Sequence, residues 1–114
     1  MRNLVRLQDY RKPPRPTFFD RQELHQLLTV YSRRVIAGEW RDYAIDHESG
    51  MATFSIFRRA ADRPAYTIVK SAPDGKGESR YVLASGGQRL KKGRSIDEVL
   101  AVLDRRPRLV YSAL

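Results

Sequence analysis

The period of the hydrophobic residues changes twice along the chain. Over residues 20–38 the apolar residues recur at helical spacing, over 40–92 they mostly alternate as in strands, and over 95–103 the helical spacing returns. An amphipathic helix buries one apolar stripe of side chains, and a sheet covered on one side buries one apolar face. The apolar stripes of the helices are therefore expected to pack against the apolar face of the sheet. This order predicts one α+β domain: a helix, an antiparallel sheet of four to five strands and a second helix, with both helices on one sheet face.

Both helical segments carry signals at their ends. Asp20 and Glu23 have the spacing of a capping box, Ser95 and Glu98 repeat it, and Gly38 is a plausible left-handed stop for the first helix. The stripes that should face the sheet are Leu24, Leu27, Leu28, Tyr31 and Val35 in the first helix, and Ile96, Val99, Leu100 and Leu103 in the second.

The strand-like segments are separated by turn signals. "WRDYAID" and "ATFSIF" flank "HESG", which predicts a hairpin that places Tyr43, Ile45, Phe54 and Ile56 on one face. "AYTIVK" and "RYVLAS" follow, and Gly86-Gly87 permits a tight turn into a short fifth segment, "QRLKK".

The positive charge is concentrated in the two tails. The chain of 114 residues has a formal net charge of +9, of which residues 1–17 carry +4 and residues 105–114 carry +3, which leaves +2 for residues 18–104. "RKPPRP" at 11–16 favours an extended, disordered basic tail over 1–17, before a single domain over 18–104. The C-terminal tail over 105–114 joins cations to apolar residues, so it is expected to add an edge strand to its own sheet or to that of a partner.

Cysteine is absent, so a disulfide framework and a thiolate site are excluded. The basic N-terminal segment lacks the apolar run of a signal peptide, and no stretch approaches the roughly 20 apolar residues of a membrane span. We therefore expect a cytoplasmic protein with no membrane association.

The strongest functional candidate is the segment "GGQRLKKGRSIDEVL" at 86–100. Its cations Arg89, Lys91, Lys92 and Arg94 are predicted to contact phosphates of RNA or DNA, assisted by amides at the start of the second helix. Asp97 and Glu98 bring two negative charges to the same place. The alternative is therefore a solvated corner whose lysines protect a sheet edge from aggregation.

Two aromatic residues offer a second route to a partner. If Trp40 and Phe57 share the sheet face away from the helices, their rings would stack on bases or form the interface of a homodimer or of another protein complex.

Acidic residues and a histidine gather only at Asp42, Asp46, His47 and Glu48. Consecutive side chains on a strand point in different directions, so these groups are not expected to converge on a metal ion. No phosphate-binding glycine loop or nucleophile motif is present. We expect no catalytic residues, no metal and no cofactor.

Four irregular stretches, "FDRQEL", "AGEWRDYAID", "FSIFRRAADRPAY" and "ASGGQRLKKGRSIDEVLAVL", resemble a family of small uncharacterised alphaproteobacterial proteins, a domain-of-unknown-function family. The resemblance covers nearly everything from Phe18 to Leu103. It implies a cytoplasmic bacterial protein and carries over no catalytic or binding residues.

A weaker resemblance, of topology alone, is to double-stranded RNA-binding domains. They share the helix, sheet, helix order and place lysines at the start of the second helix, near Lys91 and Lys92 of this chain. This chain has at least one extra strand, its cations precede the helix cap, and "HESG" lacks the Gly-Pro-x-His motif of those domains. The sequence thus predicts a small non-catalytic binding module for polyanions or nucleic acid, with a protein interaction module, such as a homodimer through the exposed sheet face, as the alternative.

Overall fold

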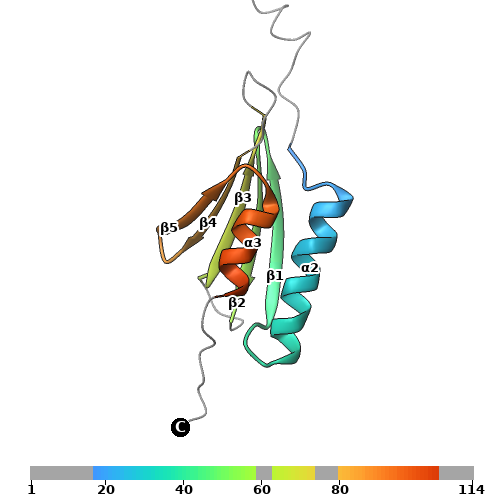
Figure 1. The fold of residues 1–114 in the computed structure, drawn as a ribbon, viewed down its shortest axis with the longest axis vertical. Helices are drawn as coiled ribbons and strands as arrows, with labels where there is room; N and C mark the ends of the chain where they lie inside the picture. The colour runs from blue at the N-terminus through green and yellow to red at the C-terminus, as the bar shows by residue number, and fades with distance from the viewer. Residues whose placement is uncertain (1–16, 59–62, 74–79, 106–114) are drawn as a thin grey trace, which may run out of the picture.

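Two helices lie on one face of a five-stranded sheet in the computed structural model (Figure 1), which describes residues 17–58, 63–73 and 80–105. The elements are α2 (Arg21–Ile36), β1 (Asp42–Glu48), β2 (Met51–Phe57), β3 (Tyr66–Ser71), β4 (Arg80–Ser85), β5 (Gln88–Gly93) and α3 (Ile96–Asp104). The predicted α+β class and the order helix, sheet, helix are confirmed.

The sheet is a meander in which each strand pairs antiparallel with the next, in the order β1-β2-β3-β4-β5. Two tight turns depend on glycine: Gly50 ends the turn between β1 and β2, and Gly86 and Gly87 connect β4 to β5, all with positive φ. Tyr43 pairs with Ile56 and Ile45 with Phe54, as the hairpin pattern predicts. The strand pairing therefore fixes which residues share each face of the sheet.

Helix α2 begins with a complete capping box. The Glu23 amide donates to Asp20 Oδ1 at 2.8 Å, and the Asp20 amide donates to Glu23 Oε1 at 2.8 Å. Gly38, with φ of 82°, follows the helix end as predicted.

The buried line of α2 differs from the predicted stripe. Val35 is 37% exposed, whereas the buried residues are Glu23, Leu27, Val30 and Arg34. Leu24, Leu28 and Tyr31 are half-buried against the core. The stripe is therefore rotated so that a charged residue lies at each end of the buried line.

Glu23 connects the beginning of α2 to the sheet. Its Oε1 accepts from Lys70 Nζ on β3 at 2.8 Å, and its Oε2 accepts from the Tyr81 hydroxyl on β4. Lys70 Nζ also donates to the carbonyl of Phe18 at 2.9 Å. The buried carboxylate thus has partners on two strands, which compensates for its removal from water.

Arg34 connects the end of α2 to α3. Its Nη1 donates to Glu39 Oε1 at 2.6 Å, and its Nη2 donates to the carbonyls of Leu103 and Asp104 at 3.1 and 3.0 Å. Its guanidinium also lies 5.2 Å from the centre of the Trp40 ring. Arg34 therefore satisfies carbonyls at the end of α3 that have no partner within the helix.

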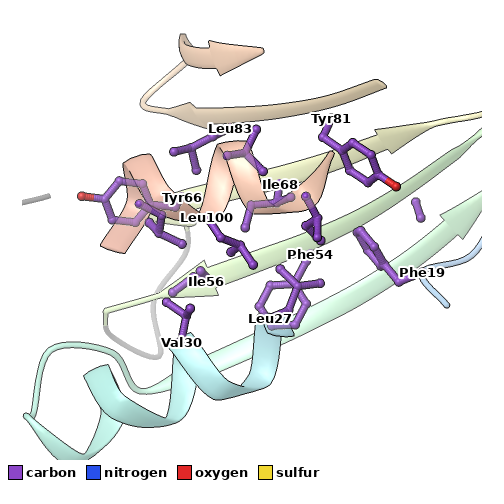
Figure 2. Close-up of a cluster of buried hydrophobic side chains, with 14 of the residues drawn as sticks. Phe19, Leu27, Val30, Phe54, Ile56, Tyr66, Ile68, Tyr81, Leu83 and Leu100 are labelled. Carbon is purple, nitrogen blue, oxygen red and sulfur yellow. The ribbon is translucent and has the colours of Figure 1, made fainter. Parts of the chain in front are cut away.

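The core lies between the two helices and the sheet (Figure 2), where the labelled side chains of α2, α3, β2, β3 and β4 point toward one another. The predicted stripe of α3 is confirmed, because Ile96, Val99, Leu100 and Leu103 are all buried. Two polar contacts join the helices above this core: Gln26 Nε2 donates to Asp97 Oδ1 at 2.7 Å, and Arg33 Nη2 donates to Asp104 Oδ2 at 3.2 Å.

Thr17 is the first described residue, and its amide donates to the carbonyl of Glu48 at 3.3 Å. Apart from Thr17 and Arg105, the two tails predicted at 1–17 and 105–114 lie outside the described residues, as does the edge strand expected of the C-terminal tail. Within residues 17–58, 63–73 and 80–105, neither helix has the length and apolar character that crossing a bilayer requires.

We expect Glu23→Ala to lower the free energy of unfolding by about 3 kcal/mol, because it leaves the Lys70 ammonium and the Tyr81 hydroxyl without their carboxylate and removes half of the capping box. Urea unfolding followed by circular dichroism measures the change. Gln22→Ala, at an exposed position of the same helix, is the control and should stay within about 0.5 kcal/mol. A loss for Glu23→Ala below about 1 kcal/mol would show that the buried carboxylate does not hold α2 on the sheet.

Candidate functional site

A β-bulge in β5 separates the four cations predicted to act together. Leu83 pairs with Lys91 and Ala84 with Arg89, so Leu90 is the extra residue, and it packs half-buried against the core. Each cation then takes the face of its partner on β4. Lys91 lies on the helix side with Leu83, whereas Arg89 and Lys92 lie on the opposite side with Ala84 and Val82.

A hollow of about 370 Å³ forms where β4, β5 and the start of α3 meet. It is lined by Arg80, Lys92, Gly93, Arg94 and Glu98. Of the four predicted cations, the structure brings only Lys92 and Arg94 to this hollow, and it adds Arg80, which the sequence interpretation missed. We name these five residues the basic hollow.

Arg80 reaches the basic hollow because antiparallel pairing places the first residue of β4 beside the end of β5. Tyr81 pairs with Gly93, so Arg80, which precedes Tyr81, and Arg94, which follows Gly93, occupy adjacent positions. The signal in the sequence was the alternation of "RYVLAS", which places Arg80 on the same face as Val82. Three cations and one carboxylate give the lining a formal charge of +2.

Gly93 lets the first turn of α3 approach the strand closely. A Cβ built on Gly93 would lie 2.9 Å from Glu98 Cβ and 3.0 Å from Glu98 Oε1. Gly93 is not among the residues with positive φ, so the requirement for glycine here is one of space. The Glu98 carboxylate is consequently held at the rim of the hollow.

The predicted capping box of α3 is wrong. The Ser95 side chain makes no cap hydrogen bond, and Glu98 Oε2 accepts instead from the amide of Arg94 at 3.4 Å. The Glu98 carboxylate therefore reaches one residue beyond the cap, toward the strand. Asp97, the other acid of the first turn, is bonded to Gln26 of α2.

The prediction that Trp40 and Phe57 share the open sheet face is wrong for Trp40. The Trp40 ring is 2% exposed and packs in the core, near Tyr31 and Tyr66. Trp40 precedes β1, so the alternation of a strand does not apply to it. Phe57 pairs with Asp42 on the face away from the helices and is half-buried, so it is the one predicted ring on that face.

The acidic residues and histidine of β1 divide between the two faces of the sheet. Asp42, Asp46 and Glu48 share the open face with their partners Phe57, Thr53 and Met51, whereas His47 lies on the helix side, with its ring 4.4 Å from that of Phe18. Among the described residues, no three histidine or carboxylate side chains are grouped as metal ligands would be.

Comparison with known proteins gives one match. The model of a family described as protein of unknown function (DUF2794) matches residues 17–100, which span α2, all five strands and the first half of α3. No curated protein and no solved structure matches the chain.

We expect Gly93→Ala to lower the free energy of unfolding by about 1–3 kcal/mol, because the new methyl group forces Glu98 and the start of α3 away from β5. The sign of the change in stability is diagnostic. Where a glycine has a compatible conformation and free space around it, its change to alanine stabilises the protein by about 0.4–1 kcal/mol. Thermal and urea unfolding measure the effect. Gln88→Ala, exposed in the same strand, is the matched control, and an equal or stabilising result for Gly93→Ala would contradict the close approach.

Proposed function

The chain belongs to the DUF2794 family, proteins of unknown function, and from this premise we propose that it is a non-catalytic binding module that holds polyanions, including the backbones of RNA and DNA, at the basic hollow. The observation that carries the proposal is the meeting of Arg80, Lys92 and Arg94 from separate elements around one hollow. Cations brought together across strands present several positive charges to a chain of phosphates at once.

The beginning of α3 adds to the attraction for anions. The first amides of a helix point outward and carry partial positive charge, and the Ser95 side chain does not occupy them. Glu98 works against this, because its carboxylate stands at the same rim. We therefore expect weak binding, with a dissociation constant on the order of 10⁻⁴ to 10⁻⁶ M near physiological salt, and no preference for sequence.

The non-catalytic part of the proposal is supported by the separation of the acidic residues of β1 from its histidine. Asp46 and Glu48 lie on one face of the sheet and His47 on the other, so they do not form a pair that could move a proton. His25, the second histidine, is exposed on α2, where it lines a different hollow together with Asp97 and Asp104 of α3.

Origin and location are also proposals that rest on the sequence. The resemblance to alphaproteobacterial proteins supports a bacterial origin, and the composition supports a cytoplasmic location, where nucleic acids are abundant. The topological likeness to double-stranded RNA-binding domains supports the position of the site, at the start of the second helix, and not a specificity for RNA.

Lys91 and Lys92 are a matched pair for testing the hollow, because they are neighbours of equal charge on opposite faces of β5. Three phosphate contacts give a plot of log K against log salt with a slope of about −2.7 for duplex DNA, in addition to any contribution of the tails. We expect Lys92→Gln to make the slope shallower by about 1 and Lys91→Gln to leave it nearly unchanged. Fluorescence anisotropy of a labelled random-sequence duplex, titrated at several KCl concentrations, measures both slopes.

The full chain is used for both variants, so the basic tails contribute equally and cancel in the comparison. Arg80→Gln should act like Lys92→Gln, since both residues line the hollow. If the two lysine variants lose the same slope, or neither loses any, binding is a property of overall charge and the hollow is not the site.

A further inference from the structure

The sheet face opposite the helices is almost free of charge in its middle. In the middle of the sheet this open face presents Thr53, Ser55, Thr67, Val69, Ser71, Val82 and Ala84, with Met51 and Phe57 on the same face at the two ends of β2. All seven residues in the middle are half-buried or buried, although both described helices pack on the other side. A sheet face in contact with water alone usually carries long polar and charged side chains, so this surface is typical of one that packs against another protein.

The two sides of the open face carry opposite charges. Strand β1 contributes Asp42, Asp46 and Glu48, whereas β4 and β5 contribute Arg80, Arg89 and Lys92. The pairing aligns these charges in rows across the sheet. One row runs Asp46, Thr53, Val69, Val82, Lys92, and the next runs Glu48, Met51, Ser71, Arg80. Each row therefore begins with an acid and ends with a base.

We propose that the open face binds a second copy of this chain, in a symmetric dimer whose two-fold axis runs parallel to the central strand β3. A rotation about that axis places β1 of one copy over β5 of the other. Asp46 then faces Lys92 of the second copy and Lys92 faces its Asp46, while Glu48 lies over the end of β5, one strand away from its Arg80. Val69 lies on the axis and meets its own counterpart.

The charge pattern selects this axis over the other two-fold arrangement of stacked sheets. An axis perpendicular to the strands would place β1 over β1 and β5 over β5, so that acids face acids and cations face cations. The small side chains of the middle strands allow the two sheets to approach to the usual distance of about 10 Å, with their strands about 30° apart. A different partner would have to present bases opposite the acids of β1 and acids opposite the bases of β4 and β5. A second copy of this chain, rotated about the proposed axis, already presents that arrangement.

The size of the face indicates a reversible dimer. Five strands about 4.8 Å apart and about six residues long give a surface of roughly 24 by 20 Å, or about 1,000 Å² counted over both copies. This area is at the lower limit of specific interfaces, so we expect a dissociation constant on the order of 10–100 µM. The inference rests on the charge rows of the open face and not on the hollow, but Arg80 and Lys92 belong to both, so the dimer is measured in the absence of nucleic acid and is also tested at Asp46, which lies outside the hollow.

Sedimentation equilibrium of the full chain, free of nucleic acid and at 1 µM to 1 mM, tests the proposal. We expect the mass to rise from one chain to two across this range. Asp46→Lys and Lys92→Asp should each weaken the dimer by at least about tenfold, because each reverses the charge at two symmetric contacts. The double variant, which exchanges the two charges, should return the dissociation constant to within about threefold of the original.

Two further variants complete the test. Arg21→Glu changes the charge by the same amount as Lys92→Asp but lies exposed on α2, on the helix side, and should leave the dimer unchanged. Val69→Lys places two like charges on the axis and should abolish the dimer, while circular dichroism confirms that the chain stays folded. A monomer at 1 mM would overturn the proposal, and so would a double variant as weak as the single ones. A stronger dimer on Asp46→Lys alone would show that β1 of one copy faces β1 of the other, and it would overturn the proposed axis.

Discussion

A pair of buried charged side chains, eleven residues apart on α2, determines how the helix layer sits on the sheet. Glu23 binds Lys70 and Tyr81 at one end, and Arg34 binds Glu39 and the last carbonyls of α3 at the other. Leu27 and Val30 lie between these two residues, and their hydrophobic contacts are non-directional. The directional bonds at both ends specify the rotation and the position of the helix, and the core packs accordingly.

The sequence predicts the parts of the fold that depend on local periodicity. The order of elements, the face of each hairpin residue and the stripe of α3 all follow from spacing. The burial of Glu23 and Arg34 on α2 was missed, because charged residues are assigned to the surface by their type. Apart from Glu39, five residues from Arg34, the partners that make burial of Glu23 and Arg34 favourable lie 47 to 70 residues away, where periodicity gives no information.

The candidate site was predicted only in its general place. The sequence indicates a cluster of cations before α3, but a bulge of one residue at Leu90 decides the face of each. A shift of one residue in the strand pairing moves a side chain to the other face of the sheet. The run of cations in the sequence therefore does not show which of Lys91 and Lys92 lies on which face. Arg80 was missed because its place beside Arg94 arises from pairing. Trp40 was misplaced because it precedes the strand whose alternation was applied to it.

The meander has a consequence for the order in which the protein folds. Every strand pairs with its neighbour in the chain, so each hairpin closes a short loop and the sheet assembles from local contacts. Helix α2 comes first among the described elements, yet its bonds to β3, β4 and α3 join residues 47 to 71 positions apart. We therefore expect α2, which leaves the ribosome before the strands, to be the last of these elements to dock, after the strands and α3 that it contacts have emerged.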